Sequence, residues 1–307
     1  MKIVCFSFKS QDRRPRAGAL VGDSLIFDFR AALEADGGSI DESAAGDMLA
    51  WLDLDGPWLP KARALYDEAA RRGPDEAREG GAFVAREDVQ LLAPVPRPGK
   101  IICIGLNYRD HAAESNMPIP ESPVIFSKFG TSVAGPNQPV LLPPASTQVD
   151  YEAEMAVVIG RRARHVARER AYDYVLGYMN FNDVSARDFQ FADKQWTRGK
   201  ACDTFAPMGE YIATTDEIPD PHRLSIKLRL NGRTMQDSNT NQLIFGVPEL
   251  IEFLSASITL EPGDVIATGT PPGVGFARTP PVFIKEGDVM EVEIEGLGIL
   301  RNPVAAT

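Results

Sequence analysis

Cysteine is scarce in this sequence. The chain of 307 residues has three cysteines, Cys5, Cys103 and Cys202, an odd number with wide spacing. This pattern excludes a disulfide framework and a CxxC metal site. We therefore expect reduced thiols in a cytoplasmic protein.

Long hydrophobic runs are also lacking. Nowhere does an uncharged apolar run reach the roughly 18 residues of a membrane-spanning helix. The first residues, MKIVCFSFKSQDRR, lack the apolar core of about 7–15 residues that a signal peptide contains. We therefore expect no membrane segment and no membrane partner.

Positive charge is in deficit. The sequence has 32 Lys and Arg residues against 43 Asp and Glu residues, and its formal net charge is −11. Such a chain repels nucleic-acid phosphates, so we expect no nucleic-acid partner. Binding of an anionic metabolite would require local positive charge, from a bound cation or from a few placed Lys and Arg side chains.

The remaining composition is that of a folded protein, because 44% of the residues are hydrophobic and 24% are charged. Three prolines lie within five positions in Pro94–Gly99, and this segment predicts a linker. We therefore expect a small N-terminal α/β accessory domain at 1–93, a linker at 94–99 and a catalytic domain at 100–307.

The expected fold class is mixed α+β. A Gly22–Asp23 turn between apolar runs predicts a hairpin within Ala17–Phe29, and apolar spacing predicts helix over Gly46–Arg72, broken at Gly56–Pro57. The second part of the chain is rich in predicted strands. The strands are expected at Ile101–Leu106, Val124–Ser127, Tyr151–Gly160, Leu224–Leu230 and Val289–Glu295, with a turn at Asn231–Gly232. Short helices are expected at about Arg109–Ser115, Ala186–Ala192 and Pro248–Ser257.

The run VDYEAEMAVVIG carries closely spaced carboxylates. In a strand, Asp150, Glu152 and Glu154 share one face, with neighbours about 7 Å apart. Three such carboxylates repel one another unless they are solvated, protonated or bridged by a cation. Oxygen ligands of this kind suit Mg²⁺ or Mn²⁺, and a solvated strand face is the alternative.

Two further features could contribute to a site. Asp183, in YMNFNDVSARDFQ, could supply a third oxygen ligand from a separate element, and a turn or capping residue is the alternative. His111 and Glu114 are three residues apart, so they share one face of a helical turn and could form a water-activating base. A surface ion pair is the alternative.

Lysines and a loop complete the candidates. Lys128 and Lys200 lie close to glycines, which allow a close approach to a ligand, although a solvated lysine is the ordinary interpretation. The loop Thr268–Gly275 matches neither a Walker nor a dinucleotide-binding pattern, but it could wrap a small ligand.

Six ordered motifs resemble the fumarylacetoacetate hydrolase family over about Lys100–Pro303: GLNYRDHAAE, SPVIFSKFGTSVAG, DYEAEMAVVIG, GYMNFNDVSARDFQ, GKACDTFAPMGE and ITLEPGDVIATGTPPGVG. The resemblance implies a β-rich catalytic domain of the family's β-roll type, usually a homodimer, with one Mg²⁺ or Mn²⁺ per active site.

The resemblance also implies roles for particular residues. The metal ligands would be Glu152, Glu154 and Asp183. The catalytic residues would be His111 and Glu114, on a lid segment, together with Lys200. The residues that bind the substrate's carboxylate and oxo groups would be Arg187, Gln190 and Thr270, and we add Lys128 to this group.

The implied reaction is hydrolysis of the C3–C4 bond of a 2,4-dioxo acid, an acylpyruvate, to pyruvate and a carboxylic acid. His111 would take a proton from the attacking water, and Lys200 would neutralise developing negative charge. Decarboxylation of an oxaloacetate-like substrate, or isomerisation or hydration in aromatic catabolism, would use the same metal and ligands. A metabolite-binding protein without turnover is disfavoured, because binding alone needs no base.

Overall fold

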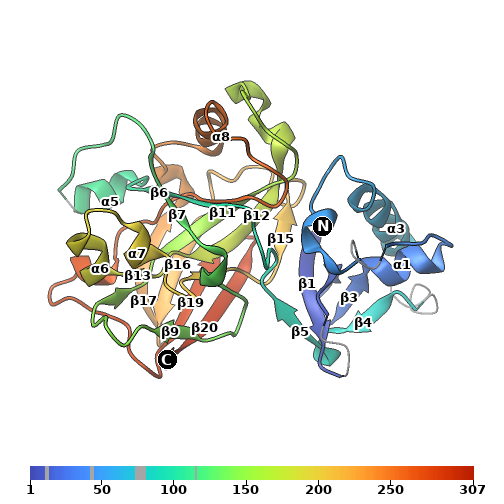
Figure 1. The fold of residues 1–307 in the computed structure, drawn as a ribbon, viewed down its shortest axis with the longest axis horizontal. Helices are drawn as coiled ribbons and strands as arrows, with labels where there is room; N and C mark the ends of the chain where they lie inside the picture. Colours follow the sequence, from blue (N-terminus) through green and yellow to red (C-terminus); the bar gives the residue numbers. More distant parts are fainter. Residues whose placement is uncertain (11–13, 42–44, 73–80, 115) are drawn as a thin grey trace.

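The computed structural model of the protein describes residues 1–10, 14–41, 45–72, 81–114 and 116–307. Two β-sheets dominate it, with short helices around them (Figure 1). The predicted mixed α+β class is therefore confirmed. Among the described residues, no helix has both the length and the apolar character needed to cross a membrane.

Within the described residues, the N-terminal part holds a small group of strands and the helices α1 (Phe29–Ala35) and α3 (Leu59–Arg72). The predicted hairpin is confirmed, since Arg16–Val21 pairs with Leu25–Asp28 and Gly22 in the turn has φ +58°. The helical pattern is also broken as expected, into a 3₁₀ helix at Met48–Trp51 and the helix α3. The elements are β1 (Lys2–Phe8), β2 (Arg16–Val21), β3 (Leu25–Asp28), α1 (Phe29–Ala35), α3 (Leu59–Arg72), β4 (Phe83–Ala85) and β5 (Val89–Leu92).

The larger sheet continues from these strands into the second part of the chain. Its order within the described residues is β4-β3-β2-β1-β15-β12-β11-β18-β6-β7, with β5 also paired to β1. The added strands are β6 (Ile101–Gly105), β7 (Val124–Lys128), β11 (Ala153–Ile159), β12 (Val175–Asn182), β15 (Ile212–Thr214) and β18 (Val265–Ala267). Because β1 pairs with β15, backbone hydrogen bonds connect the two parts, and the boundary at 94–99 stays a prediction.

The smaller sheet has the order β17-β16-β19-β20-β9. The turn between β16 and β17 is the predicted one, and Asn231 and Gly232 both have positive φ, as such a two-residue turn requires. The strands are β9 (Val140–Leu142), β16 (Ser225–Leu230), β17 (Arg233–Asn239), β19 (Val289–Ile294) and β20 (Gly298–Ala306). Two short pairs complete the strands: β8 (Val133–Ala134) with β14 (Ala206–Pro207), and β10 (Val149–Asp150) with β13 (Ser185–Ala186).

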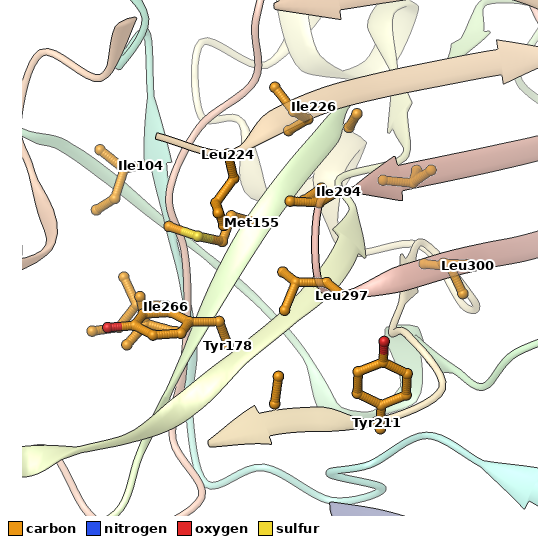
Figure 2. Packing of buried hydrophobic residues seen from close by; sticks show 14 of the residues in the cluster. Ile104, Met155, Tyr178, Tyr211, Leu224, Ile226, Ile266, Ile294, Leu297 and Leu300 are labelled. Carbon is orange, nitrogen blue, oxygen red and sulfur yellow. The ribbon is translucent and has the colours of Figure 1, made fainter. Parts of the chain in front are cut away.

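The main core lies where the two sheets pack against each other. Met155 on β11, Tyr178 on β12, Ile226 on β16 and Ile294 on β19 belong to one buried cluster (Figure 2). Alternate residues of β16 and β19 point into this core, because successive side chains of a strand face opposite sides. The packing holds the ends of β11 and β12 in place beside the site.

The helices near the site are short. Figure 1 shows α5 (Arg109–Glu114), α6 (Arg187–Ala192) and α7 (Thr197–Lys200) on the same side of the molecule. Ser115, the predicted last residue of the first of these, lies outside the described residues. The helix expected at Pro248–Ser257 is α8 (Val247–Ser255).

Candidate metal centre and active site

Three carboxylates converge where β11 begins and β12 ends. The antiparallel register pairs Ala153 with Asn182, so the residues just outside the ladder, Glu152 and Asp183, become neighbours. The Asp183 backbone N–H donates to the Glu152 carbonyl at 2.9 Å. Carboxylate oxygens of Glu152, Glu154 and Asp183 all lie within 4.8 Å of one another, and all three residues are buried.

The predicted strand Tyr151–Gly160 is interrupted at this point. β10 ends at Asp150 and β11 begins at Ala153, so Tyr151 and Glu152 lie between two ladders. The break has a polar cause, because the Glu152 N–H donates to the side-chain oxygen of Asn182 on β12 at 3.0 Å rather than to a backbone carbonyl of a neighbouring strand. It leaves the Glu152 carboxylate facing the cavity described below.

Two cations neutralise Glu152. Lys200 Nζ donates to Glu152 Oε2 at 2.8 Å and to Asp183 Oδ2 at 2.9 Å, and Arg187 Nη2 lies 2.7 Å from Glu152 Oε1. Burial alone would raise the pKa of Glu152, but the charges of Lys200 and Arg187 outweigh burial and lower this pKa to about 2. Glu152 is therefore ionised at neutral pH.

Glu154 has no such partner. Among the described residues its carboxylate accepts one hydrogen bond, from the Gly269 N–H at 2.7 Å, and forms no ion pair. Burial, followed by the charges of Asp183 and Glu152, raises the pKa of Glu154 well above its usual value. Glu154 thus lacks a compensating positive charge.

The donor set fits a hard divalent cation. Mg²⁺ and Mn²⁺ prefer carboxylate oxygens, and three converging carboxylates leave coordination positions for substrate and water. Glu154 also favours a cation at this position. Its carboxyl has no ion-pair partner in the described part of the chain, and a bound cation would supply the compensating positive charge. Glu152, Glu154 and Asp183 are the residues that would hold it.

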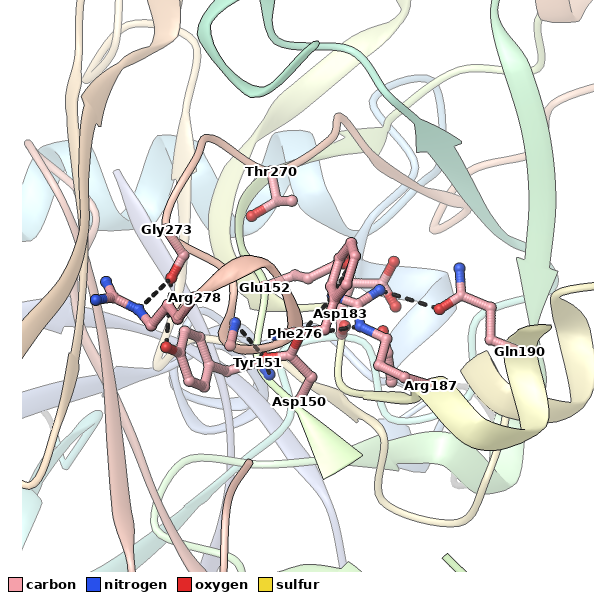
Figure 3. Close-up of polar contacts among 12 residues, drawn as sticks. Asp150, Tyr151, Glu152, Asp183, Arg187, Gln190, Thr270, Gly273, Phe276 and Arg278 are labelled. Carbon is pink, nitrogen blue, oxygen red and sulfur yellow. Dashed lines mark hydrogen bonds and ion pairs between the residues drawn. The ribbon is translucent and has the colours of Figure 1, made fainter. Parts of the chain in front are cut away.

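Asp150 anchors Arg187 and a loop. The pairing of β10 with β13 brings Asp150 beside Arg187, whose Nε and Nη2 lie 2.9 and 2.8 Å from Asp150 Oδ2 (Figure 3). The same carboxylate accepts hydrogen bonds from the N–H groups of Gly275 at 2.7 Å and Phe276 at 3.0 Å. Asp150 therefore couples the orientation of Arg187 to the loop after β18.

His111 and Glu114 form the predicted pair on α5. His111 Nδ1 lies 3.2 Å from Glu114 Oε2, and the Gly273 N–H donates to both carboxylate oxygens at 3.0 and 3.1 Å. Gly273 has φ +99°, and a Cβ there would lie 2.2 Å from the Met235 carbonyl oxygen, so only glycine fits. Burial would raise the pKa of Glu114, but the hydrogen bonds from His111 and Gly273 outweigh it and lower the pKa below its usual value.

A cavity of about 500 Å³ brings most of the predicted site residues together. The predicted residues that line it are His111, Glu114, Glu152, Arg187, Gln190, Lys200 and Thr270. Arg187 Nη1 donates to Gln190 Oε1 at 3.0 Å, so these two line one wall as a pair (Figure 3). Their roles toward a substrate stay predictions.

Lys128 lies elsewhere. Its buried ammonium sits 2.7 Å from Asp183 Oδ1 and donates to the carbonyls of Val184, Lys200 and Phe205. An ammonium has three protons, so these protein oxygens occupy all its donors. This placement offers no support for the prediction that Lys128 binds substrate, and it gives Lys128 a contact that holds Asp183.

The position of Lys128 leads to a stability prediction. Lys128→Met should lower the free energy of unfolding by about 3–5 kcal/mol, because it removes the buried positive charge beside Asp183 Oδ1 and leaves three buried carbonyls without their donor. Urea denaturation in the presence of a chelator measures this. The matched control is Lys227→Met, whose pair with Asp237 is exposed and should contribute about 1 kcal/mol or less. Equal effects of the two substitutions would contradict the assigned role.

Two buried amides that hold the site were not predicted from the sequence. Gln236 on β17 donates to Thr270 Oγ1 at 2.8 Å and accepts from the Ala153 N–H at 2.8 Å. Asn107 donates to the Thr268 and Phe245 carbonyls at 2.8 and 3.0 Å. Asn107 lies in the GLNYRDHAAE motif, which is the one available signal. No sequence signal identifies Gln236, because a lone Gln in a strand resembles any surface residue.

The fold and the site define a β-rich enzyme with a buried acidic centre. The model of the family described as "Fumarylacetoacetate (FAA) hydrolase C-terminal" matches residues 100–305, so the chain belongs to this family. The resemblance stated from the six motifs is thereby confirmed. Family membership makes the chain an enzyme, and it leaves open which of the family's reactions it catalyses.

The chain is also similar to individual members of the family over most of its length. The chain is 51% identical to oxaloacetate tautomerase fahd2, mitochondrial, from Xenopus laevis over 307 residues, covering 99% of this chain and 90% of the relative. A solved fumarylacetoacetate hydrolase from Exiguobacterium antarcticum is 34% identical with TM-score 0.82, covering 100% of both chains. A solved maleylpyruvate hydrolase from Sphingobium sp. SYK-6 is 32% identical with TM-score 0.78, again covering 100% of both chains.

Proposed function

We propose that this protein is a divalent-metal-dependent enzyme that interconverts the enol and keto forms of oxaloacetate. The observation that carries the proposal is the shared cavity of His111, a proton-transfer group, with Arg187 and Lys200, two carboxylate-binding cations. The 51% identity to an oxaloacetate tautomerase supports proton transfer over C–C hydrolysis as the main reaction.

The chemistry follows from the two nitrogens of His111. In the neutral imidazole, an Nδ1–H that donates to Glu114 leaves Nε2 free to accept a proton, and among the described residues Nε2 has no hydrogen-bond partner. In the keto-to-enol direction, Nε2 removes a proton from C3, the C2=C3 bond forms as the C2=O π bond breaks, and the imidazolium then gives the proton to the C2 oxygen. Glu114 stabilises the imidazolium between these two events.

The cations orient the substrate. Arg187, supported by Asp150 and Gln190, binds one carboxylate, and Lys200 stabilises negative charge that develops on the C2 oxygen. When bound to Glu152, Glu154 and Asp183, Mg²⁺ or Mn²⁺ supplies further positive charge for an enolate oxygen.

Hydrolysis of acylpyruvates is the second candidate activity. It needs a base for water, and His111 paired with Glu114 fits this need equally well. The 32% identity to a maleylpyruvate hydrolase also supports it. Decarboxylation of oxaloacetate requires only the electron-withdrawing cation, so the His111–Glu114 pair offers no argument for it.

One set of assays separates these reactions. Purified protein with Mg²⁺ or Mn²⁺ is given enol oxaloacetate, and loss of enol absorbance is followed together with pyruvate release. We expect accelerated loss of the enol without matching pyruvate formation. Pyruvate release from oxaloacetate at the same rate would replace tautomerisation by decarboxylation. Cleavage of acetylpyruvate with no acceleration of ketonisation would favour the hydrolase.

The expected partners are a small anionic oxo acid and a second copy of the chain, as in a family homodimer. Both are part of the proposal, and so is the cytoplasmic location expected from reduced thiols. Size-exclusion chromatography with light scattering tests the homodimer, and a monomeric mass at micromolar concentration would contradict it.

A further inference from the structure

The cavity is lined by two chemically different groups of residues. The first, which we call the polar end, holds His111, Glu114, Glu152, Arg187, Gln190, Lys200 and Thr270. The second is built from apolar side chains, among them four aromatic rings: Phe126, Phe191, Trp196 and Phe276. We call these four residues the aromatic end.

The volume exceeds what oxaloacetate requires. About 500 Å³ lies within the range of roughly 300–1,000 Å³ that encloses drug-sized ligands. Oxaloacetate is a four-carbon diacid without an apolar group, so the residues of the polar end alone could supply all the contacts that it needs. The aromatic end is therefore unexplained by the proposed reaction.

The rings are held in fixed positions. Trp196 packs edge-to-face on Phe126, with ring centroids 5.5 Å apart and an interplanar angle of 67°. A Cβ on Gly105 would lie 2.4 Å from Trp196 Cζ3, so the glycine on β6 provides the space for this ring. Phe191 and Phe276 form a second edge-to-face pair, with centroids 5.7 Å apart.

Each ring pair contacts a cation of the polar end. Lys200 Nζ lies 5.0 Å from the centroid of Phe126, and Arg187 Cζ lies 4.5 Å from the centroid of Phe276. An anion held by Lys200 and Arg187 therefore has its remaining atoms next to the rings. The two cations therefore select a ligand with an anionic head group. The rest of such a ligand would lie against the aromatic side chains.

The aromatic end also exposes apolar surface at the cavity mouth. Phe191 is 57% exposed and Met117, which lines the same cavity, is 53% exposed. Burying such surface against an apolar ligand group is favourable by about 25 cal/mol per Å². Phe191 follows Gln190 on α6, so the same short helix supplies both a polar and an apolar wall.

We propose that the aromatic end is a subsite for an aryl group carried by the oxo acid, which makes aryl-substituted 2,4-dioxo acids preferred ligands of this site. The proposal rests on the proposed function for the oxo-acid head, which Arg187 and Lys200 would bind as they would bind oxaloacetate. Phe126, Phe191, Trp196 and Phe276 are then specificity-determining residues, and they contact the part of the ligand that does not react.

Two probes with the same head test the subsite. Benzoylpyruvate and acetylpyruvate share the 2,4-dioxo acid and differ only in a phenyl or a methyl group. Their dissociation constants are measured by calorimetry with Mg²⁺-loaded protein carrying His111→Asn, which prevents turnover. We expect benzoylpyruvate to bind at least about tenfold more tightly, because the phenyl group buries more apolar area.

Substitutions in the same background assign the preference to the rings. Phe191→Ala and Trp196→Ala should each reduce the ratio of the two dissociation constants toward one and leave acetylpyruvate affinity unchanged. Phe191 is exposed, so its substitution tests the proposal without disturbing the core. The control Phe253→Ala changes an exposed phenylalanine on α8, outside the cavity, and should preserve the ratio.

The outcomes separate the two proposals. Equal affinities for the two probes would overturn the aryl subsite while leaving head recognition intact. Failure of both probes to bind would overturn the subsite, and the ketonisation assay with oxaloacetate then decides the proposed function separately. An unchanged ratio in both Phe191→Ala and Trp196→Ala would also overturn the subsite.

Discussion

His111→Asn will reduce the rate of oxaloacetate ketonisation by at least about 10²-fold, because the variant has no imidazole Nε2 to exchange a proton with C3. Asparagine keeps a polar side chain at the position but has no basic nitrogen near neutral pH. The loss should appear in kcat, since Arg187 and Lys200, the proposed carboxylate-binding residues, are unchanged. Ketonisation is followed by the loss of enol absorbance under metal saturation.

The matched control is His165→Asn. His165 is exposed and has φ +54°, a conformation that asparagine tolerates, so this change should leave the rate unaltered. Calorimetric titration of Mn²⁺ into both variants should give wild-type affinity. Wild-type ketonisation by His111→Asn with normal metal binding would remove His111 from the proposed chemistry.

Glu154→Gln will abolish tight binding of Mn²⁺ and leave the metal-free protein as stable as wild type, or more stable. The amide oxygen can still accept the hydrogen bond from Gly269, while the repulsion with Asp183 and Glu152 disappears. Loss of a charged ligand should weaken Mn²⁺ binding by more than the 10–100-fold typical of changes around a metal site.

Thermal unfolding with chelator and with Mn²⁺ measures both effects. At a free ion concentration of about 100 times Kd, wild type should gain about 2.7 kcal/mol, and the Glu154→Gln variant should gain almost nothing. Glu291→Gln, on β19 and outside the acidic centre, is the matched control and should respond like wild type. Equal stabilisation of Glu154→Gln and wild type by Mn²⁺ would falsify the ligand assignment.

Local pattern was sufficient for much of this site. A spacing of two residues brought the carboxylates of Glu152 and Glu154 together although Glu152 lies just outside β11, and helical spacing brought His111 and Glu114 together. Both relations depend only on positions two or three residues apart. The break of the strand before Ala153 was missed, since its cause is a hydrogen bond to Asn182, which lies on another strand. β12 was missed as a strand for a similar reason, because it is buried on both faces and shows no alternation.

The sequence by itself determined the fold class, the family and the candidate carboxylates, because periodicity and ordered motifs are properties of neighbouring residues. Only the tertiary structure decided which cation neutralises which carboxylate. Lys128 holds Asp183 from another strand, and the Gly273 N–H reaches Glu114 across 159 positions of the chain. Such contacts depend on how strands and loops pack. Hydrogen bonds and ion pairs between side chains become strong enough to fix their positions only after burial has excluded water.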